Sequence, residues 1–264
     1  MFVAYKPLAN LFFLTCLFAC LFATTLHAGE PRRKIVLAST FPSPGSILGT
    51  WSELILRDAF GRMGFDYEQR IMPAKRAEMI AMRGDVDGET LRQLGYGDGR
   101  PTLLRVATPH QWDSFSAYAV REIALGDGWD SLTNTNLRVN IRLGATHPEK
   151  QLKERVPSNL LEISPDFPSG LRKILANHSD IYVELESSVQ ALMVQAEFRS
   201  KGIRKIAVME RLDGYCYLHK KNQNLLVPLS ETLASMRKDG SLERYRKQAE
   251  QMELVDPTDQ TQAH

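Results

Sequence analysis

The sequence predicts a mixed α/β protein built from two successive series of strands and helices. Short apolar runs typical of buried strands alternate with stretches whose apolar residues recur at helical spacing, first over residues 34–92 and again over residues 137–209. Such alternation is typical of a mostly parallel sheet with helices on its faces. Gly126-Asp-Gly128 marks the break between the two series.

The first series opens with a buried strand over residues 34–39 and a loop over residues 40–45 that carries two prolines and a glycine. A helix is predicted over residues 49–63, because its apolar residues fall on one face. A second strand is predicted over residues 65–72. The predicted apolar face of the helix consists of Trp51, Leu54, Ile55, Ala59 and Met63.

Residues 73–92 are predicted to form a helix and a strand that together present a ligand site. Pro73 suits the first turn of a helix and Gly84 suits its end. The following strand places Thr90 and Arg92 at its carboxyl end, which is where open α/β sheets bind small ligands. Arg92 is the most suggestive side chain, because its planar fork matches a carboxylate.

The glycine-rich loop over residues 95–101 superficially resembles a phosphate-binding loop. Such a loop must open a helix, and here Pro101 and a strand-like run over residues 103–108 follow instead. We therefore do not expect nucleotide binding. Residues 112–123 are predicted to be another extended segment.

The second series continues the same alternation, and two helices close the chain before a polar tail at residues 254–264. Strands are predicted over residues 137–143, 160–163, 180–184 and 203–209, and an extended return segment over residues 214–219. Helices are predicted over residues 148–156, 165–176, 187–200, 222–238 and 241–252.

The chain of 264 residues is long enough for one large domain or two smaller lobes. Its formal net charge of +2 argues against nucleic-acid binding, which usually requires a clear basic excess. The six histidines show no metal-ligand spacing. We therefore expect no metal and no cofactor.

Residues 1–28 are predicted to be a signal peptide. Lys6 supplies a positive start, residues 8–26 are apolar and uncharged, and cleavage after Ala28 is favoured. Two alternatives stay open, a retained membrane anchor and a lipoprotein attached through Cys20. Cleavage leaves Cys216 alone, so we expect no intramolecular disulfide. Export by the signal peptide predicts a periplasmic protein, and we also expect a monomer.

Several phrases, in their order along the chain, resemble the extracellular solute-binding proteins of family 3, which are associated with polar amino acid ABC importers. The phrases are residues 73–76, 84–88 with Arg92, 104–106 with Pro109, 171–175 leading to 180–183, and 233–242. The resemblance implies the type II periplasmic-binding-protein fold, an α/β architecture of two lobes joined by a two-segment hinge. It places lobe 1 at residues 29–118 and 211–253 and lobe 2 at residues 119–210, with a cleft that closes on its ligand.

The candidate site residues of the first lobe are Arg92, Phe41, Thr40, Thr90 and Arg76. Arg92 would grip a carboxylate, the alternative being a surface salt bridge. The resemblance implies that Phe41 covers the ligand, although a loop aromatic equally fits a core position. Thr40 and Thr90 would donate hydroxyl hydrogen bonds. Arg76 is more typical of a solvated helix charge than of a ligand contact.

The candidate residues of the second lobe are Glu184 and Thr146. Glu184 would hold an ammonium group, and the alternative is that it complements the start of a helix. Thr146 lies at a predicted strand-to-helix turn, where backbone N–H groups bind anions. The family places an aspartate for the ligand's ammonium where this chain has Leu185, flanked by Glu184 and Glu186.

These features together predict a periplasmic solute-binding protein that captures a small carboxylate-bearing solute, an amino acid or a derivative, without chemistry. Its partner would be an ABC permease or a membrane sensor kinase, and the sequence favours neither. Two alternatives stay open: an interaction module with a degenerate cleft, and a periplasmic enzyme resembling cyclohexadienyl dehydratase. The enzyme would need a general acid, for which Glu89 and Glu184 are candidates.

Overall fold

The computed structural model describes Met1 and residues 32–254. The chain divides into two units, residues 1–33 and residues 34–264, and every helix and strand described here belongs to the second unit. Residues 2–28 of the predicted signal peptide and residues 255–264 of the predicted tail lie outside the described residues. Within residues 32–254 no helix combines the length and the apolar character needed to cross a bilayer.

Lobe 1 is built on three parallel strands, as the first series predicts. Strand β1 (Lys34–Ser39) pairs with β2 (Asp66–Ile71) on one side and with β3 (Gly88–Arg92) on the other. Helix α2 (Ile47–Arg62) connects β1 to β2, and α3 (Ala74–Arg83) connects β2 to β3. Gly84 ends α3 with a φ of 82°, in the left-handed region that favours glycine.

Lobe 2 repeats this construction. Strand β6 (Val139–Arg142) lies between β7 (Leu161–Ser164) and β8 (Ile181–Leu185) and is parallel to both. The helices of lobe 2 are α4 (Thr146–Lys153), α5 (Phe167–Leu175) and α6 (Glu186–Met193). The predicted α/β class is therefore confirmed in both halves.

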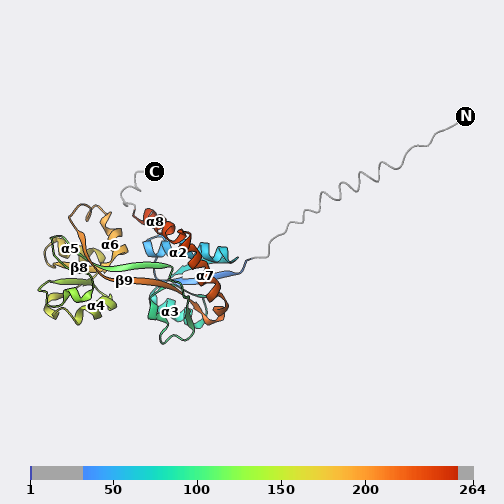
Figure 1. Cartoon of the computed structure of the whole chain (residues 1–264), viewed down its shortest axis with the longest axis horizontal. Coiled ribbons are helices and arrows are strands. Elements are labelled where there is room, and N and C mark those ends of the chain that lie inside the picture. The colour runs from blue at the N-terminus through green and yellow to red at the C-terminus, as the bar shows by residue number, and fades with distance from the viewer. Residues whose placement is uncertain (2–31, 255–264) are drawn as a thin grey trace. The chain divides into compact units, whose positions relative to one another are not determined.

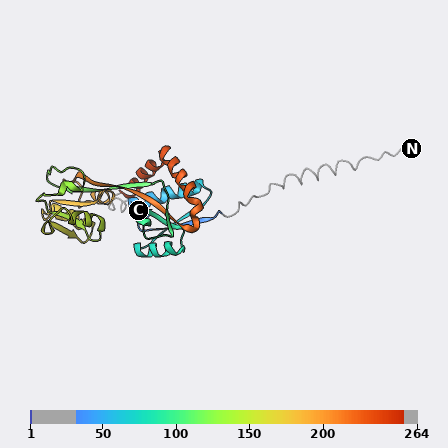
Figure 2. The same ribbon diagram turned by 60° about the horizontal axis from the view of Figure 1, so that its bottom comes forward.

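Two long antiparallel strands join the lobes, as Figures 1 and 2 both show. Strand β5 (Gln111–Ala119) pairs with β8 in lobe 2 and with β9 (Arg204–His219) along its length. The far end of β9 pairs with β3 and with β4 (Leu103–Arg105) in lobe 1. The predicted lobe boundaries fall within these shared strands.

Strand β9 is longer than the sequence indicates. The prediction separates a strand over residues 203–209 from a return segment over residues 214–219, whereas the structure has one strand. The ladder to β5 explains the continuity, because it pairs Phe115 with Glu210 and continues to the pair between Gln111 and Gly214. This long-range pairing extends the strand through a polar stretch that has no strand pattern of its own.

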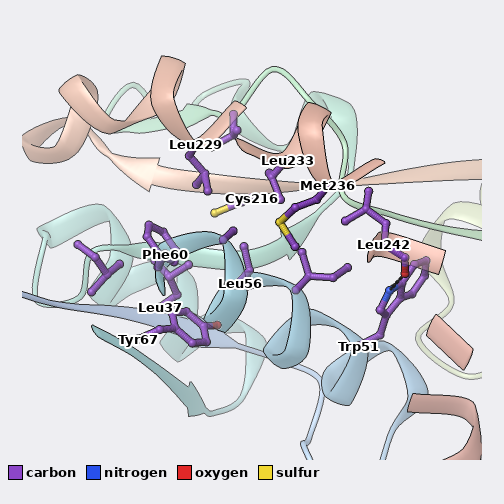
Figure 3. Packing of buried hydrophobic residues seen from close by; sticks show 14 of the residues in the cluster. Leu37, Trp51, Leu56, Phe60, Tyr67, Cys216, Leu229, Leu233, Met236 and Leu242 are labelled. Atoms are coloured by element: carbon purple, nitrogen blue, oxygen red, sulfur yellow. Dashed lines mark hydrogen bonds between the residues drawn. The ribbon is translucent and has the colours of Figure 1, made fainter. Parts of the chain in front are cut away.

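Each lobe has its own core. In lobe 1, α7 (Leu226–Lys238) and α8 (Ser241–Glu253) pack against α2, and Figure 3 shows their side chains meeting those of α2 and β1. The Trp51 indole donates a hydrogen bond of 2.9 Å to the Leu242 carbonyl. Cys216 is fully buried in this cluster, where a free cysteine behaves as a small apolar residue.

Two helices depart most from their predicted lengths, and both are shorter. Helix α6 ends at Met193 rather than at residue 200, and Ser200 and Gly202 adopt φ values of 62° and 76° that no helix accommodates. The helix predicted over residues 222–238 is a short 3₁₀ segment, η4 (Lys220–Leu225), followed by α7. Asn222 leaves helical geometry because its amide donates a hydrogen bond of 2.9 Å to the Asp87 carboxylate.

Candidate functional site

A cavity of about 480 Å³ lies where β5 and β9 leave lobe 1. Its walls come from lobe 1, from both hinge strands and, through Leu185, from the end of β8 in lobe 2. We call this cavity the cleft. The lining residues are Thr40, Phe41, Leu48, Leu91, Arg92, Gln93, Gly95, Tyr96, Gln111, Trp112, Asp113, Phe115, Leu185, Leu212, Asp213 and Gly214.

Arg92 lines the cleft, but its charge is already paired. Its Nε donates a hydrogen bond of 2.7 Å to Oε2 of Glu89, and its Nη2 donates a second, shorter one to the same oxygen. The Tyr96 hydroxyl donates 2.7 Å to the other carboxylate oxygen of Glu89. The side chain of Glu89 is only 1% exposed, so this acid is held behind Arg92 and out of the solvent.

The pairing fixes which part of the guanidinium a solute can reach. Glu89 occupies the Nε edge, and the Tyr96 ring lies 4.6 Å from the guanidinium carbon. Nη1 of Arg92 makes no hydrogen bond within residues 32–254, so Glu89 leaves this part of the guanidinium open. Burial, followed by the hydrogen bond to Glu89, raises the pKa of the Tyr96 phenol.

A bulge in β3 brings Glu89 and Arg92 together. Glu89 pairs with Tyr217 and Arg92 pairs with Tyr215, so three steps along β3 match two steps along β9. In a regular strand, residues three apart point to opposite faces. The extra residue in β3 places both side chains on one face, and bulges often reorient side chains next to binding sites in this way.

The hinge strands contribute two carboxylates to the cleft. Asp113 accepts a hydrogen bond of 2.6 Å from the Ser187 hydroxyl at the start of α6, and one of 2.7 Å from its neighbour's backbone N–H. Burial raises the pKa of the Asp113 carboxyl despite these bonds. Asp213 is exposed, and its side chain makes no hydrogen bond or ion pair within the described part of the chain.

Three further aromatic rings line the cleft beside Tyr96. Trp112 meets Trp51 edge to face, with ring centroids 4.9 Å apart. Phe115 stacks on His147 of lobe 2 at 5.9 Å. Phe41 lies in the loop after β1, where its backbone N–H and carbonyl both contact the Ser39 hydroxyl.

The loop that carries Thr40 and Phe41 is attached to the last turn of α8. The Glu253 carboxylate accepts 2.9 Å from the Gly45 backbone N–H and 2.5 Å from the Thr50 hydroxyl. The C-terminal helix thus holds the loop that forms one wall of the cleft.

No family model matches the sequence. An uncharacterized protein of Shewanella oneidensis is 32% identical over 225 residues, which are 85% of each chain. The chain belongs to the same family as this Shewanella protein.

Solved structures with the type II fold cover most of the chain. A histidine kinase sensor domain with similarity to periplasmic binding proteins is 21% identical with a TM-score of 0.60, over 83% of this chain and 96% of that one. The L-cystine solute receptor of Neisseria gonorrhoeae, in its unliganded open conformation, is 13% identical with a TM-score of 0.64, over 85% and 94%.

A third structure of the same fold is an amino acid ABC transporter substrate-binding protein from Streptococcus pneumoniae, bound to L-arginine. It is 14% identical with a TM-score of 0.58, over 84% of this chain and 97% of that one. The resemblance expected from the sequence is therefore confirmed: the chain has the type II periplasmic-binding-protein fold, like binding proteins of the amino-acid type.

Three of the predicted site residues, Thr40, Phe41 and Arg92, meet at the cleft of this binding-protein fold. Thr90 follows Glu89 on β3 but is 1% exposed and does not line the cleft. Arg76 is exposed on α3 and is also absent from the lining.

The two predicted residues of lobe 2 do not line the cleft either. Glu184 is buried in lobe 2, where Arg142 pairs with it at 3.1 Å and the Tyr182 hydroxyl donates to it at 3.2 Å. Burial raises the pKa of the Glu184 carboxyl. Thr146 is exposed at the first position of α4. Of the two carboxyls considered as general acids, neither Glu89 nor Glu184 lines the cleft.

Sequence reasoning missed most of the hinge contribution. Gln111, Asp113 and Asp213 reach the cleft because β5 and β9 pair across about a hundred residues of sequence. A partly alternating pattern over residues 112–123 predicts an extended segment but carries no information about its partner. Leu185 does reach the cleft, at the position where the family resemblance implies an aspartate.

Proposed function

We propose that this protein captures a small solute, an amino acid or a derivative of one, in the cleft and closes its two lobes over it. The observation that carries the proposal is the cleft itself, which is lined by lobe 1, both hinge strands and the end of β8. Bending of β5 and β9 would move Leu185 and Phe115 relative to Phe41 and Arg92. Binding would then be coupled to closure, as in hinged domains generally.

The chemistry of the lining fits an amphoteric solute with an apolar body. A carboxylate on the solute would meet the outer Nη edge of Arg92, which Glu89 leaves open. An amine would meet Asp113 or Asp213. Phe41, Trp112 and Phe115 would contact the apolar part.

We further propose that capture occurs in the periplasm, after export by the segment at residues 1–28, and serves a membrane partner. An ABC permease and a membrane sensor kinase are both compatible with the fold, because its neighbours include a transporter's binding protein and a kinase sensor domain. A reconstituted permease or kinase encoded beside this protein would distinguish the two, since only one would respond to the loaded protein.

A thermal-shift screen of amino acids, amines, small acids and oligopeptides tests the proposal. A solute present at a hundred times its Kd stabilises the folded state by about 2.7 kcal/mol, which is about 5–10 °C for a protein of this size. Small-angle X-ray scattering with the same solute should show a smaller radius of gyration. A screen without any hit would refute solute capture and favour an interaction module, while turnover of the hit would favour an enzyme.

A further inference from the structure

We propose that the cleft recognises organic cations, so that the amine of the solute is the group required for binding and a carboxylate is dispensable. This inference rests on the proposed solute capture and specifies the class of solute. It predicts that an amine binds at least as tightly as the amino acid from which it is derived. The sequence alone predicts that Arg92 makes the main contact with the solute, through the solute's carboxylate, whereas this proposal assigns that role to the solute's amine.

The first step is the charge of the lining. Arg92 is the only basic residue among the lining residues, and Asp113 and Asp213 are the acidic ones. Glu89 cancels the charge of Arg92 through two hydrogen bonds and is itself 1% exposed. A solute therefore meets a neutral pair and two carboxylates, which is an environment that repels anions.

The second step is the permanence of the Arg92–Glu89 pair. Glu89 cannot turn toward water, because it is buried and Tyr96 holds its second oxygen. A buried carboxylate that lost its counter-charge would be strongly disfavoured. A solute carboxylate can add to the outer edge of Arg92, but it cannot displace Glu89 and gains little net charge attraction there.

The third step is the availability of groups for a cation. Asp213 is exposed in the wall of the cleft, and its side chain makes no hydrogen bond or ion pair among residues 32–254. The rings of Phe41 and Phe115 also line the cleft, whereas the Trp112 ring already has the Arg246 guanidinium carbon 5.8 Å from its centroid. Aromatic faces attract ammonium and guanidinium groups, and more strongly when water is excluded.

Matched sets of three probes test this inference by calorimetry on the mature protein. One set is tyramine, tyrosine and 3-(4-hydroxyphenyl)propionate, and the others are the corresponding amine, amino acid and acid for the phenylalanine and leucine skeletons. Within each set that binds, we expect the amine to bind at least as tightly as the amino acid. We expect the acid to bind at least about tenfold more weakly than the amine.

Two variants and one control separate the roles of the carboxylates. Asp213→Asn should weaken amine binding by about tenfold, whereas Asp66→Asn, an exposed acid at the start of β2, should leave it unchanged. Glu89→Gln should shift the ratio of acid to amine affinity toward the acid by about tenfold, because it unmasks the charge of Arg92. Circular dichroism and the melting temperature establish that each variant is folded.

Each outcome has a defined meaning. Tight binding of acids and amino acids without binding of amines would overturn the inference and leave solute capture standing. If Asp213→Asn binds amines with the same Kd as the parent protein, the inference is also overturned. The Asp213→Asn result alone tests the inference if Glu89→Gln does not fold. Failure of all nine probes would overturn the inference, and the wider screen would then decide on solute capture.

Discussion

His110 should make this protein unusually sensitive to acid. It precedes β5 at the base of the hinge, is fully buried, and neither ring nitrogen has a hydrogen-bond partner among residues 32–254. Burial, with a smaller effect of the Arg237 charge, lowers its pKa from 6.5 to about 3. The folded protein therefore keeps this ring neutral at pH values where the unfolded chain protonates it.

The size of the effect follows from the two pKa values. Since the folded pKa is lowered, the contribution to stability is fully present above pH 6.5 and is lost as the pH falls toward 3. At about 1.4 kcal/mol per pH unit, the folded state loses about 3 kcal/mol between pH 7 and pH 4 through this residue alone. Replacement of His110 by leucine fills the site with an apolar side chain and removes this loss.

Urea unfolding of both proteins at pH 7 and pH 4 measures the difference. The parent should lose about 3 kcal/mol more than His110→Leu over this interval. Asp87 and Asp180, whose pKa values are lowered in the fold, also destabilise it as the pH falls, but equally in both proteins. His178→Leu, at an exposed histidine, should retain the parent's pH dependence. The same pH dependence in His110→Leu and the parent would show that the buried ring is protonated in the folded state, contrary to the reasoning.

Three further predictions concern the frame of the cleft. Arg92→Ala should lower the free energy of unfolding by about 3 kcal/mol, because it leaves the buried Glu89 carboxylate without its counter-charge. In urea titrations, the double variant Arg92→Ala with Glu89→Leu should recover part of that loss. Gly88→Ala should destabilise the protein by more than about 2 kcal/mol or prevent folding, because an added Cβ would lie 2.0 Å from the Tyr217 carbonyl oxygen and Gly88 has a φ of 156°. The melting temperature measures this effect. A value within 2–4 °C of the parent's, which corresponds to about 1 kcal/mol, would refute the prediction. Glu253→Ala should weaken binding of the solute found in the screen while the protein stays folded, because it releases the loop of Thr40 and Phe41 from α8, and calorimetry would disprove this if the Kd stayed the same.

The sequence predicts the local elements of lobe 1 well because their signals are local. Gly84 ends α3 in the conformation that glycine favours. Three of the five residues predicted for the apolar face of α2, Trp51, Ile55 and Ala59, are buried. The arrangement of the hinge is different. Strand β9 owes its length to pairing with β5, so no window of the sequence contains the information that places Asp113 and Asp213 beside Arg92.

The electrostatic character of the cleft depends on strand register more than on composition. In an unbroken strand, Glu89 and Arg92 would point to opposite faces, and Arg92 would offer its full charge to a solute. One extra residue in β3 places Glu89 opposite Tyr217 and Arg92 opposite Tyr215, two positions that share a face of β9. The same two residue types at the same spacing thus give either a free guanidinium or a neutral pair, and only the pairing with β9 decides which. A carboxylate clamp cannot be assigned from an arginine at the end of a strand until the register of that strand is known.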